Sequence, residues 1–233
     1  MAPSVKRPAD TCGEGRPVSA NRWCTDPQAP VWWESACAGL AATDSRWETL
    51  IRRHPDRSLR SRGDAYQTLV RAIVGQQISV KAADAVFARV LALLGGSVEP
   101  SAVLAAPVTG LRNAGLSERK VEYLRSLAEF DLAGGLQQER LADLSDDACI
   151  RHLVQVRGIG RWTAEMFLIF NLMRPDVWPV DDIGLLKGLG LLLCEGKIPD
   201  RRQADTMGEA LRPYRTVATW YLWRSLDPIA VDY

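Results

Sequence analysis

The chain has 233 residues, of which 47% are hydrophobic and 24% charged, and its formal net charge is +1. These values fit one enzyme-sized globular unit, built around one large core or around two subdomains that share helices. No apolar run reaches the length of a membrane span, so we expect a soluble protein without a membrane partner. A near-neutral net charge gives little support for nucleic-acid binding, although an enzyme that contacts few phosphates does not need a large positive net charge.

Cysteine and histidine usage excludes several kinds of site. The five cysteines are odd in number and widely spaced, which favours reduced thiols in a cytosolic setting over a disulfide framework. They show no zinc or iron-sulfur spacing, and two histidines are too few for a histidine-based metal site or a Ser-His-Asp triad. Catalysis must therefore rest on carboxylates, lysine or a cofactor. We expect a cytoplasmic protein, associated with the nucleoid in a prokaryote.

The first part of the chain differs in composition from the rest. Residues 1–30 contain five prolines and scattered charges without an apolar core, which predicts a disordered tail rather than a secretory signal. From residue 31 onward, apolar residues recur at spacings of three and four, with turn residues between the segments. This pattern predicts helices almost throughout.

Caps and breakers place the helices in chain order. Two apolar stripes over residues 32–51 predict a first pair of helices. Asp64 is the expected N-cap of a strong helix that ends near Gly75, and Ser79 is the expected N-cap of the next. That next helix ends at residues 95–96, where two glycines follow each other.

The later helices are bounded in the same way. Pro100 suits a first helical position, and Pro107 and Gly115 delimit two short pieces. Ser117 begins a long helix that ends at the glycines of residues 134–135. Ser145 then begins a helix that enters a hairpin. After the hairpin and its helix, the pattern predicts three more helices, over roughly residues 182–192, 203–212 and 214–226.

The hairpin reads Arg-Gly-Ile-Gly-Arg-Trp from Arg157 onward. Gly158 and Gly160 permit positive φ and let a phosphate approach the main chain without a Cβ in the way. The following helix begins near Arg161, so its free amides and its dipole face the same phosphate. The plainer interpretation is a helix C-cap and connector, which an isolated Gly-Ile-Gly would favour.

A pair of acids follows about twenty residues further on. Pro179 disfavours helix at Trp178, so Asp181 and Asp182 fall in the first turn of the next helix, and we assign the N-cap to Asp181. Both acids fit ordinary helix-start positions. A carboxylate beside a phosphate grip can also stabilise a sugar cation, so the hairpin and the acids together suggest a DNA base-removing enzyme.

Three segments together resemble the helix-hairpin-helix DNA glycosylase superfamily, most closely its 3-methyladenine DNA glycosylase II branch. The segments are Ile-Val-Gly-Gln-Gln-Ile-Ser at 73–79, Gly-Ile-Gly-Arg-Trp-Thr-Ala-Glu at 158–165, and Pro-Val-Asp-Asp-Ile at 179–183, with Lys187 beyond. The resemblance covers about residues 64–225. It implies an all-α fold, in which two helical subdomains flank a DNA-binding cleft. We expect one subdomain to comprise residues 31–75 and 176–233, and the other, which carries the hairpin, residues 76–175.

The resemblance also implies a reaction. The catalytic aspartate of the family corresponds to Asp182, because Leu185 then takes the apolar position three residues later. Related lyases have a nucleophilic lysine two residues after the second hairpin glycine, where this chain has Trp162, and tryptophan cannot form a Schiff base. We therefore expect a monofunctional enzyme that hydrolyses the N-glycosidic bond of alkylated purines in base excision repair. The four-cysteine cluster of another branch is missing around Cys194, so no iron-sulfur cluster and no required cofactor are expected.

Further site residues follow from the resemblance. Trp162 and Tyr214 correspond to walls of the pocket for the flipped base, although both also fit core positions. Gln77 corresponds to the residue that fills the gap left in the duplex. A monovalent cation in such a hairpin is held by carbonyl groups that correspond to those of Val154, Val156 and Ile159. Contacts to DNA are expected from the hairpin and from polar side chains near it, namely Ser79, Gly158, Gly160, Arg161, Thr163, Lys187 and Arg215.

The expected partner is damaged double-stranded DNA, bound by a monomer. The sequence leaves three alternatives: a glycosylase for oxidised or deaminated purines, a non-catalytic DNA-binding module, and a catalytically silent scaffold. Asp182 argues against a pure DNA binder, because a carboxylate beside a phosphodiester repels DNA. The arginines of residues 46–62 carry little weight as a DNA surface, since they do not share one face.

Overall fold

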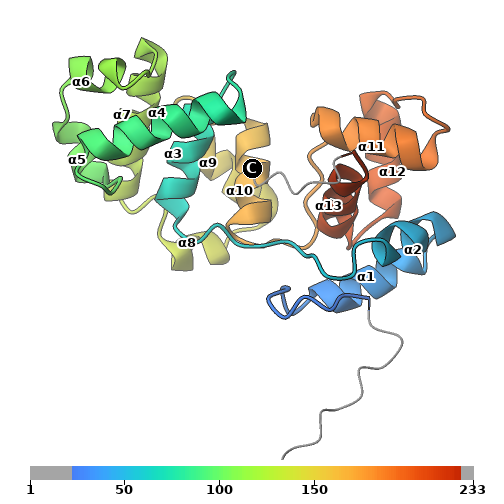
Figure 1. Ribbon diagram of the computed structural model, residues 1–233. Helices are drawn as coiled ribbons and strands as arrows, with labels where there is room; N and C mark the ends of the chain where they lie inside the picture. Colours follow the sequence, from blue (N-terminus) through green and yellow to red (C-terminus); the bar gives the residue numbers. More distant parts are fainter. Residues whose placement is uncertain (1–22, 227–233) are drawn as a thin grey trace, which may run out of the picture.

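The computed structural model describes residues 23–226 of the chain and divides them into two helical lobes (Figure 1). Every regular element in this range is a helix, which confirms the predicted all-α class. None of these helices is long and apolar enough to cross a membrane. Residues 1–22, which make up most of the predicted tail, lie outside the described part.

The first lobe combines helices from both ends of the described chain (Figure 1). Its central helix is buried around its whole circumference from Thr216 to Trp223, because other helices of the lobe pack around it. The lobe consists of α1 (Trp33–Ala41), α2 (Ser45–Arg52), α11 (Ile183–Leu193), α12 (Arg201–Ala210) and the central α13 (Arg215–Leu226).

The second lobe is formed by the middle of the chain. Its long helix α7 packs against α3, α5 and α6, and α3 also packs against α4 and α10. The lobe consists of α3 (Ala65–Gly75), α4 (Val80–Leu93), α5 (Pro100–Ala105), α6 (Val108–Asn113), α7 (Glu118–Leu132), α8 (Gln138–Ala142), α9 (Asp146–Leu153) and α10 (Arg161–Phe170). From the sequence we expected residues 65–75, which form α3, in the other subdomain, with the boundary between the subdomains at residue 75. The packing moves that boundary to the segment between α2 and α3.

Side-chain caps fix most of the predicted helix starts. Asp64 accepts a hydrogen bond from the amide of Gln67 at 2.6 Å, and Ser79, Ser117 and Ser145 each cap their helices in the same way at 3.3 Å. Pro100 takes the first position of α5, as expected. The short helix α8 was not predicted.

The end of the predicted tail is part of the folded lobe. The amides of Trp23 and Cys24 both donate to the carboxylate of Glu34 in α1 at 2.7 Å. Asp26 is buried and accepts hydrogen bonds from Ser58 and Arg60. The prediction of a disordered tail over residues 1–30 is therefore wrong for residues 23–30. These contacts could not be predicted from local sequence patterns, because their partners lie at least ten residues away.

The chain crosses between the lobes twice, at residues 53–64 and 171–182 (Figure 1). The two crossing segments are tied together, since the amide of Arg62 donates to the carbonyl of Phe170 at 2.9 Å and Asn171 Nδ2 donates to the carbonyl of Gly63 at 2.8 Å. The second crossing brings the start of α11 back to the start of α10. The acid pair and the hairpin therefore meet where the lobes join.

Candidate active site

Asp182 lies at the junction of the lobes and accepts three hydrogen bonds. Its Oδ1 accepts from the amide of Leu185 at 2.7 Å and from the indole Nε1 of Trp223 at 2.8 Å. Its Oδ2 accepts from Nε1 of Trp162 at 2.9 Å. An ionised carboxylate offers only acceptors, so three N–H donors complement its charged form.

The N-cap assignment made from the sequence is wrong. Asp182, not Asp181, is the N-cap of α11, because its side chain bonds to the amide three residues later. The amide of Asp182 donates to the carbonyl of Pro179 at 2.8 Å, which makes a turn directly before the helix. Asp181 points elsewhere and forms an ion pair with Arg201 at 2.7 Å. One carboxylate thus serves as helix cap and as the centre of the site.

Two tryptophans flank this carboxylate from different lobes. Trp162, at the start of α10, is 41% exposed, which is unusual for so large an apolar side chain. Trp223, in α13, is 8% exposed and stacks on Phe170 with ring centroids 5.8 Å apart and an interplanar angle of 12°. The guanidinium of Arg62 lies 4.6 Å from the centroid of the Phe170 ring. The carboxylate therefore has one open aromatic neighbour and one that is held rigidly.

Tyr214, the second expected pocket wall, lies elsewhere. Its ring packs so closely on α1 that a Cβ on Gly39 would overlap it. It precedes Trp223 by nine positions, which is about 13 Å along a helix. The structure thus places Trp223, and not Tyr214, beside Asp182. The sequence missed Trp223 because it belongs to an apolar run that is buried on all sides.

The hairpin has the expected backbone, with a difference between its glycines. Gly158 has φ of 88°, and a Cβ there would overlap the ring of Tyr123 in α7. Gly160 has φ of −89° and is the N-cap of α10, without a side-chain capping bond, and a Cβ there would meet nothing within 4 Å. A positive φ therefore explains the need for glycine at position 158 but not at position 160. The open space beside Gly160 is what a phosphate would need.

The first turn of α10 supplies free amides next to that space. Its first helical hydrogen bond runs from the amide of Ala164 to the carbonyl of Gly160, so the amides of residues 161–163 have no partner within the helix. Thr163, an expected DNA contact, has a buried side chain, and only its amide remains suitably placed. Arg161 is 54% exposed at its side chain. The candidate phosphate site therefore consists of main-chain amides and one cationic side chain.

Glu165 is the buried partner of that cation. Glu165 is 2% exposed, and its carboxylate accepts a hydrogen bond from Nε of Arg161 at 2.8 Å. Burial raises the pKa of Glu165 to about 7, against the opposing effect of Arg161 and with a smaller contribution from the negative charge of Asp181. The carboxyl of Glu165 thus interacts with the charge of Arg161 in the hairpin helix and with that of Asp181 in the acid pair.

Of the other predicted DNA contacts, some are exposed and one is held within the protein. Gln77 and Ser79 are exposed at the turn between α3 and α4, as a DNA contact requires. Lys187 is exposed on α11. Arg215 is not available, because its guanidinium binds both carboxylate oxygens of Asp176, at 2.8 and 2.9 Å, with 13% of its side chain exposed. Arg215 is therefore a structural residue.

The carbonyls expected to hold a cation lie at the end of α9 and in the hairpin. The carbonyl of Val156 already accepts the amide of Ile159 at 3.0 Å, which leaves it one lone pair. Val154 is the C-cap of α9. Within residues 23–226, no group of three or more His, Cys, Asp or Glu side chains could hold a metal ion.

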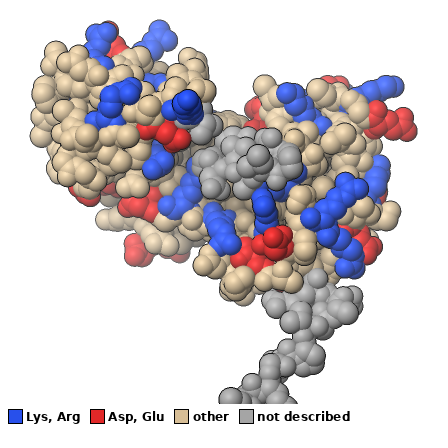
Figure 2. All heavy atoms as spheres, in the orientation of Figure 1, with Lys and Arg blue, Asp and Glu red and all other residues tan. Residues whose placement is uncertain are grey.

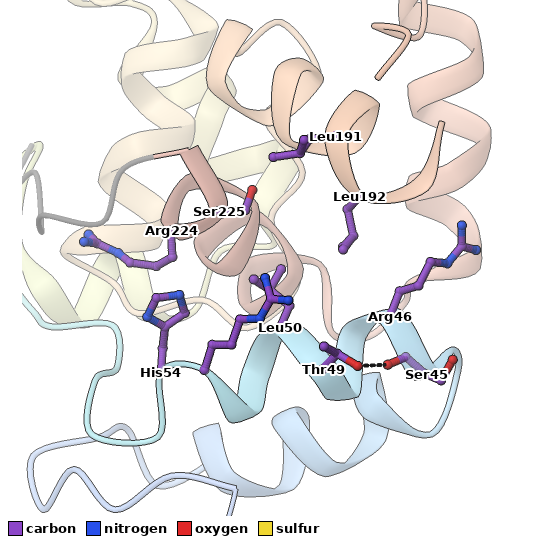
Figure 3. A pocket seen from close by; sticks show the side chains of 10 residues that line it. Ser45, Arg46, Thr49, Leu50, His54, Leu191, Leu192, Arg224 and Ser225 are labelled. Atoms are coloured by element: carbon purple, nitrogen blue, oxygen red, sulfur yellow. Dashed lines mark hydrogen bonds between the residues drawn. The ribbon is translucent and has the colours of Figure 1, made fainter. Parts of the chain in front are cut away.

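A pocket of about 580 Å³ lies on the first lobe between α2, α11 and α13 (Figure 3). Leu191 and Leu192, which line it, lie about 14 Å further along α11 than Asp182. Its other lining residues are Ser45, Arg46, Thr49, Leu50, Arg53, His54, Arg224 and Ser225.

Comparison with known proteins agrees with this geometry. Residues 70–213 match the model of the HhH-GPD superfamily of base excision DNA repair proteins. The chain belongs to this superfamily, as its hairpin and its acid pair indicated.

Several relatives carry more specific names. DNA-3-methyladenine glycosylase 1 of Schizosaccharomyces pombe is 36% identical over 193 residues, which cover 80% of this chain and 84% of the relative. DNA-3-methyladenine glycosylase of Saccharomyces cerevisiae is 32% identical, with 69% of this chain and 66% of the relative covered.

Solved structures show the same fold. The DNA-3-methyladenine glycosidase of Bacillus halodurans is 36% identical and superposes with a TM-score of 0.76 over 85% of this chain and 92% of that one. The Schizosaccharomyces pombe enzyme Mag1, solved in complex with abasic DNA, is 35% identical with a TM-score of 0.72, over 85% of this chain and 98% of that one.

Proposed function

We propose that the protein is a monofunctional DNA glycosylase that hydrolyses the N-glycosidic bond of alkylated purines of the 3-methyladenine type. The observation that carries this proposal is Asp182, held by two indole donors from two lobes beside a hairpin with free amides. The names of the relatives support the substrate class.

The carboxylate suits the departure of a base. As the glycosidic bond breaks, the sugar acquires oxocarbenium character, and the charge of Asp182 stabilises it. The base leaves with the bonding electron pair, water bonds to the sugar carbon, and the proton that the water loses passes to Asp182 or to solvent. The indole hydrogen bonds keep both oxygens oriented, so that the carboxylate does not have to reorganise during the reaction.

The aromatic neighbours suit a cationic base. The target nucleotide must be extruded from the duplex, which costs a few kcal/mol and costs least for a damaged pair. A purine methylated at N3 or N7 is positively charged, so it is attracted to the face of an electron-rich ring. The open indole of Trp162 offers such a face next to the catalytic carboxylate.

DNA binding would rest on the main chain more than on a charged surface. On the face that Figure 2 shows, Lys and Arg lie on both lobes with Asp and Glu between them, rather than in one continuous basic patch. The hairpin amides and Arg161 would hold one phosphate. A monovalent cation bound by the carbonyls of Val154, Val156 and Ile159 would add positive charge at the same place. We propose that a monomer binds damaged duplex DNA in this way.

One assay tests the proposal. Purified protein is incubated with duplexes that carry 3-methyladenine, 7-methylguanine, hypoxanthine, ethenoadenine or 8-oxoguanine, and free base and strand scission are measured separately. We expect release of the alkylated bases without scission. Release of only deaminated or oxidised bases would support the alternative specificity, and binding without any release would contradict the proposal.

A further inference from the structure

The turn between α3 and α4, here called the wedge turn (Gly75–Ile78), has a strained backbone. The amide of Ile78 donates to the carbonyl of Gly75 at 3.4 Å, and Gln76 has φ of −54° and ψ of 128°. Gln77 then has φ of 60°, as in a type II turn, whose third position normally requires glycine. A glutamine persists there only if its surroundings impose the conformation.

One such constraint comes from the hairpin. Gln76 Nε2 donates a hydrogen bond to the carbonyl oxygen of Gly158 at 2.8 Å, between residues 82 positions apart in the chain. This carbonyl belongs to the glycine whose positive φ and contact with Tyr123 fix the hairpin. A side chain of the wedge turn is therefore attached directly to the backbone that offers its amides to a phosphate.

Helix α7 supports both ends of this connection. Nζ of Lys120 donates to the carbonyl of Val74, in the last turn of α3, at 2.7 Å. Further along the same helix, Ser126 Oγ accepts a hydrogen bond from the amide of Arg157 at 3.3 Å. The wedge turn and the hairpin are thus mounted on one helix and joined to each other by Gln76.

Gln77 and Ile78 extend from this connection into solvent. Gln77 is exposed, and Ile78 is 40% exposed although it is a large apolar residue. An exposed apolar side chain next to a strained residue is costly in a free protein, and it suits a surface that enters a base stack. Because the two side chains follow Gln76 directly, their position relative to the hairpin depends on it.

We propose that Gln76 is a positioning residue, which fixes the wedge turn against the hairpin so that insertion into the duplex and the grip on the phosphate act as one rigid unit. This inference rests on the proposed function, since it assumes a duplex from which a nucleotide is extruded. A preformed unit avoids the entropy that would be lost if the turn had to be ordered on the DNA. Neither Gln77 nor the hairpin alone gives this property.

The test uses the full chain and a change that preserves shape. Gln76→Glu keeps the size of the side chain but removes the donor, and Gln76→Met removes it without adding charge. Gln138→Glu is the matched control, because Gln138 is exposed at the start of α8, away from both the turn and the hairpin. Binding is measured by fluorescence anisotropy on a duplex with a tetrahydrofuran abasic analogue, and base opening by a neighbouring 2-aminopurine.

We expect both Gln76 variants to weaken binding about tenfold, because without this hydrogen bond the turn has to be ordered on the DNA. The 2-aminopurine signal falls with it, while the melting temperature stays near that of Gln138→Glu. In a double-mutant cycle with Gln77→Gly, which removes the wedge side chain and suits the positive φ, the second change adds less than about twofold. Multiplicative effects in the cycle, or binding equal to that of the control, would overturn the inference.

The cycle also separates this inference from the proposed function. It is read from binding and base opening, which need no chemistry. If the wild-type protein releases no base from any lesion, the proposed function fails, while the coupling of Gln76 and Gln77 can still be measured. If bases are released normally but the cycle is multiplicative, only the positioning role of Gln76 is lost.

Discussion

The indole of Trp162 donates to Oδ2 of Asp182 at 2.9 Å, between the first turn of α10 and the N-cap of α11. This bond joins the helix of the proposed phosphate site to the proposed catalytic carboxylate. A tryptophan at this place contributes in two ways, through its ring face and through its N–H group. The two contributions can be separated by mutation.

Replacement of Trp162 by phenylalanine keeps an aromatic face and removes the donor. A hydrogen bond to a charged group contributes about 1.5 to 3 kcal/mol, so we expect the single-turnover rate of base release to fall roughly ten- to a hundredfold. Affinity for abasic DNA should change little. An excision rate equal to that of the wild type would show that the N–H group has no role in orienting Asp182.

The two hairpin glycines should respond differently to alanine. Gly158→Ala places a Cβ against Tyr123 at positive φ, so we expect a loss of stability of at least about 1 kcal/mol, measured by chemical denaturation. Gly160→Ala meets no neighbour, so it should fold normally and lose affinity for duplex DNA. Normal DNA affinity in Gly160→Ala would place the phosphate elsewhere.

The buried carboxyl of Glu165 should make stability depend on pH. Its pKa is raised from 4.5 to about 7 in the folded state, so the folded protein holds a proton that the unfolded chain releases. The contribution of Glu165 to the free energy of unfolding therefore decreases as pH rises from about 4.5 to 7, by an amount on the order of 3 kcal/mol, and does not change further above that range. Denaturation at several pH values measures this.

Glu165→Gln is the matching control for this pH dependence. It keeps the shape of the side chain and removes the titration, so the decrease between about pH 4.5 and 7 should be smaller by the same amount. Other carboxyls with raised pKa values, such as Asp131 and Asp146, contribute equally to both proteins. Identical pH profiles for the two proteins would contradict the assignment of the proton to Glu165.

Local features were predictable from the sequence, since they depend on neighbours in the chain. The hydrogen bonds by which Ser79, Ser117 and Ser145 cap their helices span only three residues. Such caps can therefore be predicted from the local sequence. The prediction of Asp181 rather than Asp182 as the N-cap was wrong, because a difference of one position leaves the local pattern almost unchanged. The reaction-centre aspartate came from the resemblance, not from this pattern.

Features that depend on tertiary contacts were not predictable in this way. Trp223 looks like a core residue among its neighbours in α13, and only the fold shows its hydrogen bond to Asp182, 41 residues away. The sequence did not single out Gln76, because its hydrogen bond to Gly158 joins residues 82 positions apart. The place of α3 in the second lobe likewise follows from its packing against α7 and α10.

The central claim concerns Asp182, and the most direct measurement is single-turnover base release by Asp182→Asn beside Asp181→Asn. Asparagine also caps helices, so we expect Asp182→Asn to fold and to bind abasic DNA, but to lose base release by at least about a thousandfold. Asp181→Asn loses only an exposed ion pair with Arg201 and should retain activity and stability within about 1 kcal/mol. Full base release by Asp182→Asn would contradict the account.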